Sequence, residues 1–260
     1  PSFADAIHRV LDNPDWMDLR DVDIALLGAG AEMAPTRSLL RWGARVHAID
    51  LPRPGIWERL TAITRSTAGS LRVPIPLNAQ GQPPFVVEGD VHPDDDATIC
   101  SAAGIDLVTA APEVRTWLAE IDRPFVLGTY AYADGAQHVQ ISEASDVIVT
   151  DLLRRRDDIT LAYLATPTDV FVVPAECVEE SCQRWQGRGL GGLLQAPLRI
   201  ARQFEPNYPQ IYSTPSGDQV GLNDSIIPQQ GANYILAKRI QRWRALAARA
   251  DGVPVSLNLA

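Results

Sequence analysis

The chain has 260 residues, of which 46% are hydrophobic, so it can form one large α/β domain or two small ones. The net charge of −9 argues against nucleic-acid binding, and the sequence has neither a membrane-spanning apolar run nor the apolar segment of a signal peptide. Its three cysteines (Cys100, Cys177 and Cys182) form no even disulfide framework and match no zinc spacing, so we expect a reduced, cytoplasmic protein.

The first strong pattern is a strand, a glycine turn and a helix near the start of the chain. Ile24–Leu27 is a short apolar run of the kind found in a buried parallel strand. Gly28 and Gly30 then allow a tight turn and the close approach of a ligand. A helical pattern over about 35–42 follows, and a glycine ends it. These features predict the first crossover of a parallel sheet.

An acidic residue follows the second predicted strand. Residues 44–49 form that strand, and Asp50 ends it, 22 residues after Gly28. In nucleotide-binding folds, phosphates lie at the N-terminus of the helix after the glycine turn, and the acid accepts hydrogen bonds from a ribose. We therefore predict a nucleotide site here, although an α/β crossover that binds no nucleotide would show the same pattern.

The segment after Asp50 departs from a simple alternation of strands and helices. We predict a helix over about 56–67, and the proline- and glycine-rich stretch after it makes residues 52–95 look like an insertion. Residues 85–87 are predicted as a short strand. Three successive acids, Asp94, Asp95 and Asp96, could suggest a metal site, but acids also stabilise a helix N-terminus, so we predict no metal.

The rest of the chain alternates between strand and helix patterns. Predicted strands cover 105–108, 125–127, 159–164, 170–173 and 253–259, and predicted helices cover 111–118, 143–156, 176–185 and about 233–250. A glycine-rich loop at 187–192 carries no phosphate-binding motif. The alternation predicts an α/β fold, a doubly wound parallel sheet with helices on both faces. We interpret residues 1–260 as one Rossmann-like domain with a variable segment at 157–209.

Tyr234 and Lys238 are four residues apart at the start of the last predicted helix, so their side chains point the same way. A lysine cation favours the ionised form of a nearby phenol, which can then exchange a proton with a carbonyl or an alcohol. A core tyrosine and a solvent lysine would show the same spacing. The pair follows a strand that ends at Ser213 and precedes a helix and a final strand, which makes the catalytic interpretation more specific.

In these features the chain resembles the short-chain dehydrogenase/reductase family, over residues 23–50, 105–156 and 210–260. The resemblance implies a Rossmann fold, a nicotinamide cofactor, and interconversion of a carbonyl and a secondary alcohol by hydride transfer. The substrate would be a small carbonyl or alcohol compound, with an acyl thioester as one candidate. Helices equivalent to 143–156 and 232–250 commonly form the family's subunit interface, so the resemblance also implies a homodimer or homotetramer.

The resemblance assigns the cofactor contacts through the glycine turn. Gly28 matches the first glycine of the family's loop, and Glu32 and Ala34 replace the second and third. Glu32 places a negative charge near a pyrophosphate, which should weaken binding unless the side chain turns outward. Asp50 matches the acid that favours NAD(H) over NADP(H), although Arg53 could reach a 2′-phosphate. The residues implied to contact the dinucleotide are Gly28, Gly30, Glu32, Met33, Asp50, Asp106, Thr129, Tyr130, Ala131 and Lys238.

The resemblance also assigns the catalytic residues. Tyr234 and Lys238 match the family's catalytic tyrosine and lysine, and Asp151 falls where the family's helix carries a catalytic asparagine. The family's serine lies closer to its tyrosine than Ser213 does here. A longer loop would therefore have to bring Ser213, or else Ser216, back to the tyrosine to orient the substrate oxygen.

Two other interpretations remain open. A class I methyltransferase also begins with a strand, Gly-x-Gly, a helix and a strand that ends in an acid, but it leaves Tyr234 and Lys238 without a role. A noncatalytic Rossmann module, which binds a nucleotide or a partner protein, needs neither residue. Binding of NADH against S-adenosylmethionine separates the two enzymes, and the placement of Ser213 or Ser216 beside Tyr234 would favour the reductase.

Overall fold

The chain forms two compact units in the computed structural model. The described residues are 3–78, 80–81, 95–186, 197, 200–201, 208 and 210–259. The larger unit combines residues 1–165 with 236–260, and the smaller unit consists of residues 166–235. The segment that the sequence analysis interpreted as variable, 157–209, is thus largely part of a unit with its own sheet rather than a loop of a single domain.

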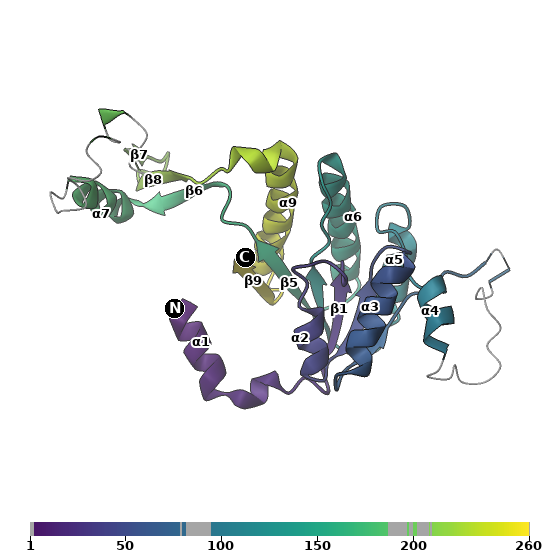
Figure 1. The fold of residues 1–260 in the computed structure, drawn as a ribbon. Coiled ribbons are helices and arrows are strands. Elements are labelled where there is room, and N and C mark those ends of the chain that lie inside the picture. The colour runs from purple at the N-terminus through teal and green to yellow at the C-terminus, as the bar shows by residue number, and fades with distance from the viewer. Residues whose placement is uncertain are drawn as a thin grey trace. The chain divides into compact units, whose positions relative to one another are not determined.

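The larger unit is built on a six-stranded parallel sheet, within the described residues, of order β3-β2-β1-β4-β5-β9 (Figure 1). Its strands are β1 (Asp23–Leu27), β2 (Arg45–Ile49), β3 (Ser70–Arg72), β4 (Phe125–Thr129), β5 (Ile159–Ala165) and β9 (Val255–Leu259). Leu27 lies opposite Ile49 on one side and Thr129 on the other. The strand order reverses at β1, as in dinucleotide-binding sheets. The predicted doubly wound parallel sheet is confirmed.

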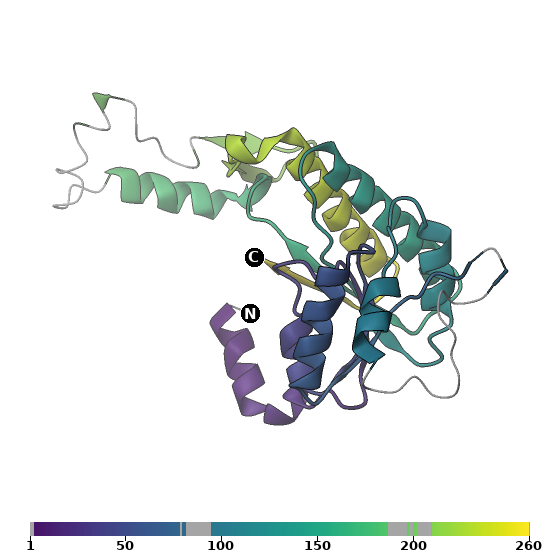
Figure 2. The ribbon, with the colours of Figure 1, turned by 45° about the vertical axis from the view of Figure 1, so that its right-hand side comes forward.

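Helices cover both faces of this sheet. They are α2 (Thr36–Arg41), α3 (Pro54–Arg65), α4 (Asp96–Ala102), α5 (Ala111–Ala119), α6 (Ala136–Leu153) and α9 (Gly231–Ala250). One core joins α5, α6 and α9 to the sheet through Leu118, Leu152 and Ala245, and a second core joins α2 and α3 to the other face through Leu40 and Trp57. Figures 1 and 2 both show α6 and α9 side by side.

The central strand β1 shows why the sheet is buried on both faces. All five of its residues are buried, and successive side chains alternate between the two cores. Leu27 enters the core with α5, α6 and α9, whereas Leu26 enters the core with α2 and α3. Full burial of each leucine contributes about 1.5–3 kcal/mol relative to exposure. The apolar run that predicted this strand is therefore also what fixes it at the centre.

The structure corrects the prediction for the region between β2 and β4. Residues 105–108 form a turn, not a strand, because Asp106 Oδ1 accepts a hydrogen bond from the Val108 N–H at 2.8 Å. Within the supposed insertion at 52–95, α3 packs on the sheet and β3 pairs in parallel with β2. Both elements belong to the fold. The predicted strand at 85–87, Asp94, and the glycine loop at 187–192 lie outside the described residues.

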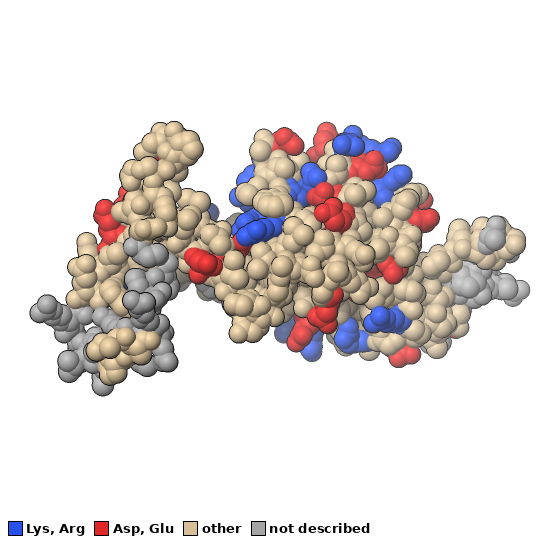
Figure 3. All heavy atoms as spheres, turned by 90° about the horizontal axis from the view of Figure 1, so that it is seen from above, with Lys and Arg blue, Asp and Glu red and all other residues tan. Residues whose placement is uncertain are grey.

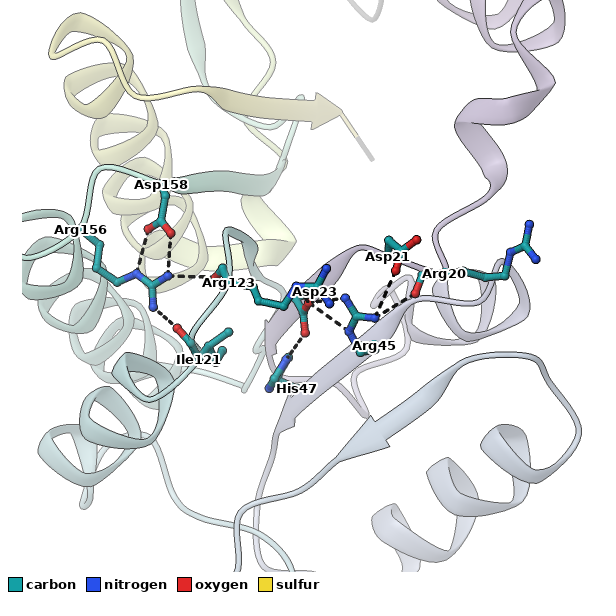
Figure 4. Close-up of polar contacts among 9 residues, drawn as sticks. All are labelled: Arg20, Asp21, Asp23, Arg45, His47, Ile121, Arg123, Arg156 and Asp158. Carbon is teal, nitrogen blue, oxygen red and sulfur yellow. Dashed lines mark hydrogen bonds and ion pairs between the residues drawn. The ribbon is translucent and has the colours of Figure 1, made fainter.

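The amino edge of the sheet carries a buried ion-pair cluster (Figure 4). Asp23, the first residue of β1, is 3% exposed and accepts hydrogen bonds from His47 Nε2 at 2.9 Å and from Arg45 Nη2 at 2.8 Å. Arg123 Nε lies 3.9 Å from the same carboxylate. Burial acts to raise the pKa of Asp23, but the hydrogen bonds from Arg45 and His47 together outweigh it, so the pKa is lowered. Asp23 is therefore a charged anchor for the start of β1.

The smaller unit has an antiparallel sheet of its own. Its elements are β6 (Val170–Pro174), α7 (Ala175–Gln186), β7 (Ile211–Ser213), β8 (Gln219–Asp224) and η3 (Pro228–Gln230), and the strand order is β6-β8-β7. Gly221 of β8 packs against α7, since a Cβ there would lie 2.2 Å from Val178 Cγ2. The sequence analysis did not predict β8, which pairs with both other strands.

The chain begins with α1 (Phe3–Asp12) and the 3₁₀ turn η1 (Pro14–Met17), which lead into β1. Among the described residues, no helix is both long and apolar enough to cross a membrane. Nor does this part of the chain hold a cluster of three or more His, Cys, Asp or Glu side chains suited to a metal. Figure 3 shows acidic and basic side chains interspersed on the face in view.

Candidate functional site

A cavity of about 390 Å³ lies at the carboxyl edge of the parallel sheet, beside β1. The chain continues from β1 to β2 on one side of β1 and later returns to β4 on the other side. The connections that follow β1 and β4 therefore lead away from this point in opposite directions. The lining residues are Gly28, Gly30, Ala31, Asp50, Leu51, Arg53, Ile56, Ile105, Asp106, Leu107, Ala131, Tyr132, Ala133, Asp134, Gln137 and Ile141. The cavity is thus at the place where open α/β sheets bind ligands.

Gly28 brings the turn after β1 against the loop after β4. Its φ is +86°, and a Cβ at this position would lie 2.4 Å from both the backbone N and the Cα of Ala131. A side chain would therefore meet both an unfavourable backbone conformation and backbone atoms that cannot rotate away. The packing of these two loops requires glycine independently of any ligand.

The carboxylate of Asp50 borders the cavity at the end of β2. Its Oδ2 accepts a hydrogen bond from the Gly30 N–H at 2.7 Å, and its Oδ1 accepts one from the Leu51 N–H at 2.8 Å. Arg59 Nη2 donates to the Gly30 carbonyl oxygen at 2.6 Å, which fixes the turn from the other side. Because a carboxylate has about four acceptor positions, Asp50 can still accept hydrogen bonds from two sugar hydroxyls.

Other amides of the glycine turn are bonded within the protein. The N–H groups of Gly28 and Ala29 both donate to the Ile49 carbonyl oxygen, at 2.8 and 3.1 Å, and the Ala31 N–H donates to the Gly28 carbonyl oxygen at 3.1 Å. The helix that follows, α2, has only 6 residues. The turn therefore holds Asp50 in place but commits these amides to the protein rather than to a phosphate.

The ionisable residues that line the cavity are mostly acidic. Asp50, Asp106 and Asp134 contribute carboxylates, and Arg53 contributes the one guanidinium among the lining residues. Such a lining favours hydrogen-bond donors such as hydroxyls over additional phosphate groups. Asp106 and Ala131, which the resemblance implies as cofactor contacts, both line this cavity, although Asp106 comes from a turn and not from the end of a strand.

Five residues implied to contact the cofactor do not line this cavity: Glu32, Met33, Thr129, Tyr130 and Lys238. Glu32 and Met33 are exposed and do not line it, so the charge of Glu32 faces solvent. Thr129 is the last residue of β4 and is buried beside Tyr163. Burial raises the pKa of Tyr163, and the Thr129 hydroxyl acts to lower it. Tyr130 packs against the core with α2 and α3, and burial raises its pKa. These two residues support the site from beneath.

Lys238 lies at the same edge of the sheet as the cavity. It is the only lysine in the sequence, and its Nζ donates to the Leu164 carbonyl oxygen near the end of β5 at 3.0 Å. A second hydrogen bond joins Nζ to Gln241 Oε1 at 3.3 Å. Burial lowers the pKa of the Lys238 ammonium. Tyr234 is half-buried and lies one turn earlier on α9, so the predicted spacing is realised on one helix.

His138 connects the cavity with Lys238, and the sequence analysis missed it. Its ring is 1% exposed and packs edge-on against the ring of Tyr132, which lines the cavity, with 4.8 Å between centroids. Burial lowers the pKa of His138 to about 4, and the positive charge of Lys238 contributes in the same direction. His138 is thus neutral at physiological pH. Only its direction on α6 distinguishes it from a surface histidine, and the sequence does not give that direction.

The structure does not bring Asp151 to the cavity, which corrects the prediction of a proton-relay role. Asp151 pairs with Arg155 Nε at 2.8 Å and with Arg115 Nε at 3.1 Å. The hydrogen bond from Arg155 lowers its pKa. Because α6 begins at Ala136 rather than at 143, Asp151 lies near the end of the helix, about 21 Å along its axis from the cavity-lining Gln137.

The predicted serines belong to the smaller unit. Ser213 is exposed at the end of β7, and its hydroxyl accepts a hydrogen bond from Gln219 Nε2 at 2.8 Å. Ser216 bonds to Thr214 at 2.8 Å and to Asp218 at 2.7 Å within the turn that joins β7 to β8. Ser213 does end a strand, as predicted, but that strand pairs antiparallel with β8 instead of joining the parallel sheet.

No protein-family model matches the chain, and no curated protein matches it. Among solved structures it is similar to a thiolation-reductase di-domain from an archaeal non-ribosomal peptide synthetase, with 11% identity and a TM-score of 0.43 over 99% of this chain and 46% of that chain. It is also similar to the 3-oxoacyl-[acyl-carrier protein] reductase from Brucella melitensis ATCC 23457, with 8% identity and a TM-score of 0.38 over 58% and 54% of the two chains. This chain spans about half the length of both, and similarity at this level carries no information about activity.

Proposed function

We propose that this chain is an oxidoreductase that binds a nicotinamide dinucleotide at the carboxyl edge of the parallel sheet and interconverts a carbonyl and a secondary alcohol. The observation that carries the proposal is the position of Lys238, whose ammonium lies 3.0 Å from the Leu164 carbonyl oxygen, at the same edge as the cavity and Asp50. Tyr234 adds a phenol one turn away on the same helix. A half-buried lysine with a tyrosine one turn away on the same helix suits proton exchange with an oxygen.

The residues present fit the sugar of such a cofactor better than its phosphates. Asp50 would accept hydrogen bonds from a ribose, and the acidic lining favours NAD(H) over NADP(H). The glycine-turn amides that bond to Ile49 and Gly28 would not reach a pyrophosphate without rearrangement. We therefore expect weak dinucleotide binding, dominated by the nucleoside. When bound, the nicotinamide ring donates or accepts the hydride.

The chain's own residues would handle the proton. In the reductive direction, the Tyr234 hydroxyl would donate a proton to the oxygen that becomes the alcohol, and it would take that proton back in the oxidative direction. The positive charge of Lys238 would stabilise the phenolate that remains. The proposal gives no role to Ser213 or Ser216, whose hydroxyls are bonded within their own hairpin, or to Asp151.

Cofactor binding is the first test. Titration with NADH and NADPH, followed by nicotinamide fluorescence, should show tighter binding of NADH and a loss of that preference in Asp50→Ala. Asp151→Ala removes a carboxylate far from the cavity and should leave both affinities unchanged. Tighter binding of NADPH by the unaltered chain would contradict the assignment to NAD(H).

The catalytic test follows with hydride transfer over a panel of ketones, 3-oxoacyl thioesters and secondary alcohols. Tyr234→Phe keeps the ring and removes the hydroxyl, so turnover should fall by about 10²–10⁴-fold while NADH affinity is retained. Tyr132→Phe is a matched loss of a hydroxyl on the cavity wall and should reduce turnover far less. Unchanged turnover in Tyr234→Phe would remove that residue from the mechanism.

A noncatalytic nucleotide-binding module is the second candidate, and two observations favour it. The glycine-turn amides are committed to the protein, and both predicted serines lie in the smaller unit. This candidate predicts binding of a nucleoside or mononucleotide, abolished by Asp50→Ala, with no hydride transfer on any substrate in the panel. A third arm with S-adenosylmethionine tests the methyltransferase alternative.

A further inference from the structure

Gln241 lies between Lys238 and α6 in the interior of the larger unit. Its side chain is 4% exposed, and it lies three residues after Lys238 on α9, on the same side of the helix. Its Oε1 is 3.3 Å from Lys238 Nζ, and its Nε2 donates to the hydroxyl oxygen of Ser142 on α6 at 3.3 Å. Ser142 is itself 1% exposed. Three polar groups thus form a buried chain across two helices.

The chemistry of these groups fixes the orientation of the amide. A lysine ammonium has three donors and no acceptor, so only the oxygen of Gln241 can face it. The amide nitrogen must then face Ser142, whose hydroxyl oxygen can accept. With the amide held at both ends, two of the three Lys238 N–H groups are directed at fixed acceptors, Gln241 Oε1 and the Leu164 carbonyl oxygen. Leu164 and Gln241 thus supply the two acceptors that the ammonium has among the described residues.

We propose that Gln241, held by Ser142, is a positioning residue that fixes the Lys238 ammonium against the end of β5. A four-carbon lysine side chain carries considerable rotamer entropy, and two fixed acceptors select one position for its charge. A neutral amide does this without adding a buried negative charge, which would bind the ammonium more tightly and oppose its interaction with a ligand. The inference deepens the proposed function, since it rests on Lys238 acting at the site.

The single lysine makes a direct test available. A sample labelled with ¹⁵N and ¹³C in lysine alone gives one side-chain signal, and its titration reports the pKa of Lys238 without substrate or cofactor. Gln241→Leu removes an acceptor that stabilises the ammonium, so the titration should shift to lower pH. Gln241→Glu supplies a carboxylate at the same place, so the titration should shift to higher pH than in the unaltered chain.

Two serine variants on α6 show whether the effect passes through the buried chain. Ser142→Ala removes the group that holds the Gln241 amide and should shift the Lys238 titration in the same direction as Gln241→Leu, by a smaller amount. Ser145→Ala is the matched control, because Ser145 is equally buried but its hydroxyl donates to the Ile141 carbonyl oxygen at 2.8 Å. It should leave the titration unchanged.

The outcomes separate this inference from the proposed function. An unchanged Lys238 titration in Gln241→Leu, or equal shifts in Ser142→Ala and Ser145→Ala, would overturn the positioning role. The expected shifts without NADH binding or hydride transfer would uphold the positioning role and reject the oxidoreductase. Folding is checked on the same samples by near-ultraviolet circular dichroism. If Gln241→Leu does not fold, Gln241→Glu and the two serine variants decide the question.

Discussion

The two edges of the parallel sheet differ in chemistry although the same strands form both. At the amino edge, β1 begins with the buried carboxylate of Asp23, which pairs with Arg45 and accepts a hydrogen bond from His47 (Figure 4). At the carboxyl edge, the same strand ends at Leu27, and Gly28 follows beside a cavity of about 390 Å³. The amino edge is held by hydrogen bonds and an ion pair to Asp23, whereas the carboxyl edge borders the cavity. The two ends of this five-residue strand thus have different surroundings.

We expect the largest loss of stability when a charge is removed at the amino edge of the sheet. Asp23→Ala leaves Arg45 and His47 facing an empty, buried position, so the free energy of unfolding should fall by about 3–5 kcal/mol. Asp96→Ala breaks an ion pair with Arg65 that is 36–50% exposed, and because solvent screens such a pair, the loss of stability should be much smaller. Urea unfolding followed by tryptophan fluorescence measures both. Equal losses would mean that the Asp23 cluster is not an anchor.

Gly28, at the carboxyl edge, is compared with Gly252, elsewhere in the chain, because both have a φ of +86°. A Cβ at Gly252 meets nothing within 4 Å, whereas at Gly28 it meets the Ala131 backbone at 2.4 Å. Gly252→Ala should therefore destabilise by about 1–2 kcal/mol, from the backbone alone. Gly28→Ala should cost about 1–3 kcal/mol more, from the contact with Ala131, and weaken NADH binding. Thermal unfolding and the NADH titration check the pair, and similar stabilities would show that the two loops separate freely.

Acid should destabilise the larger unit through His138. Its pKa in the folded chain is about 4, against 6.5 for an ordinary histidine, so below pH 6.5 the unfolded chain takes up a proton that the folded chain does not. Stability should thus fall by about 2 kcal/mol between pH 7.5 and 5. Below pH 4, where both the folded and the unfolded chain bind the proton, this group should cause no further loss of stability. His138→Gln should remove most of that slope, and His8→Gln, at an exposed position, should remove none. A slope that persists in His138→Gln would assign it to His47, whose pKa burial also lowers.

The smallest effect is expected on the outer surfaces of α6 and α9, the helices that run between the two edges. Val147 on α6 is 62% exposed, and Trp243 and Leu246 on α9 are 54% and 50% exposed. We propose that these surfaces associate into a homodimer or homotetramer. Trp243→Glu should weaken association by more than about tenfold, since one buried side chain contributes about 1.5–3 kcal/mol. Leu77→Glu, at a residue 61% exposed elsewhere, is the control. A sedimentation mass of 28.3 kDa for the unaltered chain at micromolar concentration would contradict the proposal.

The predicted fold was correct where the apolar pattern is continuous. Ile24–Leu27 and residues 125–127 read as buried strands and are central strands of the sheet. Residues 105–108 also contain apolar side chains, but the Asp106 carboxylate closes a turn that no periodicity predicts. The three-residue strand β3 is 70–72, Ser-Leu-Arg, and too short and polar to be recognised. Short elements are determined by their neighbours more than by their own sequence.

The candidate site was predictable only as far as sequence spacing reaches. Gly28 and Asp50 were found because their separation reflects one crossover, and both line the cavity. Asp151 was misplaced because its role depended on where α6 begins, which is seven residues earlier than predicted. His138 and Gln241 were missed because only the rotation of α6 and α9 against the sheet turns them inward. Such residues look like ordinary polar helix residues until the helices are packed.

The interruption of the larger unit by residues 166–235 has a consequence for how such a protein can evolve. Residues 166–235 begin directly after β5 and end within α9. The Lys238 side chain of α9 is hydrogen-bonded to Leu164 of β5. The two points of the larger unit that the inserted segment connects are thus neighbours in space. A segment between neighbouring ends can be lengthened, exchanged or lost while the parallel sheet keeps every strand pairing. Exchange of the hairpin and α7 is therefore compatible with an unchanged parallel sheet.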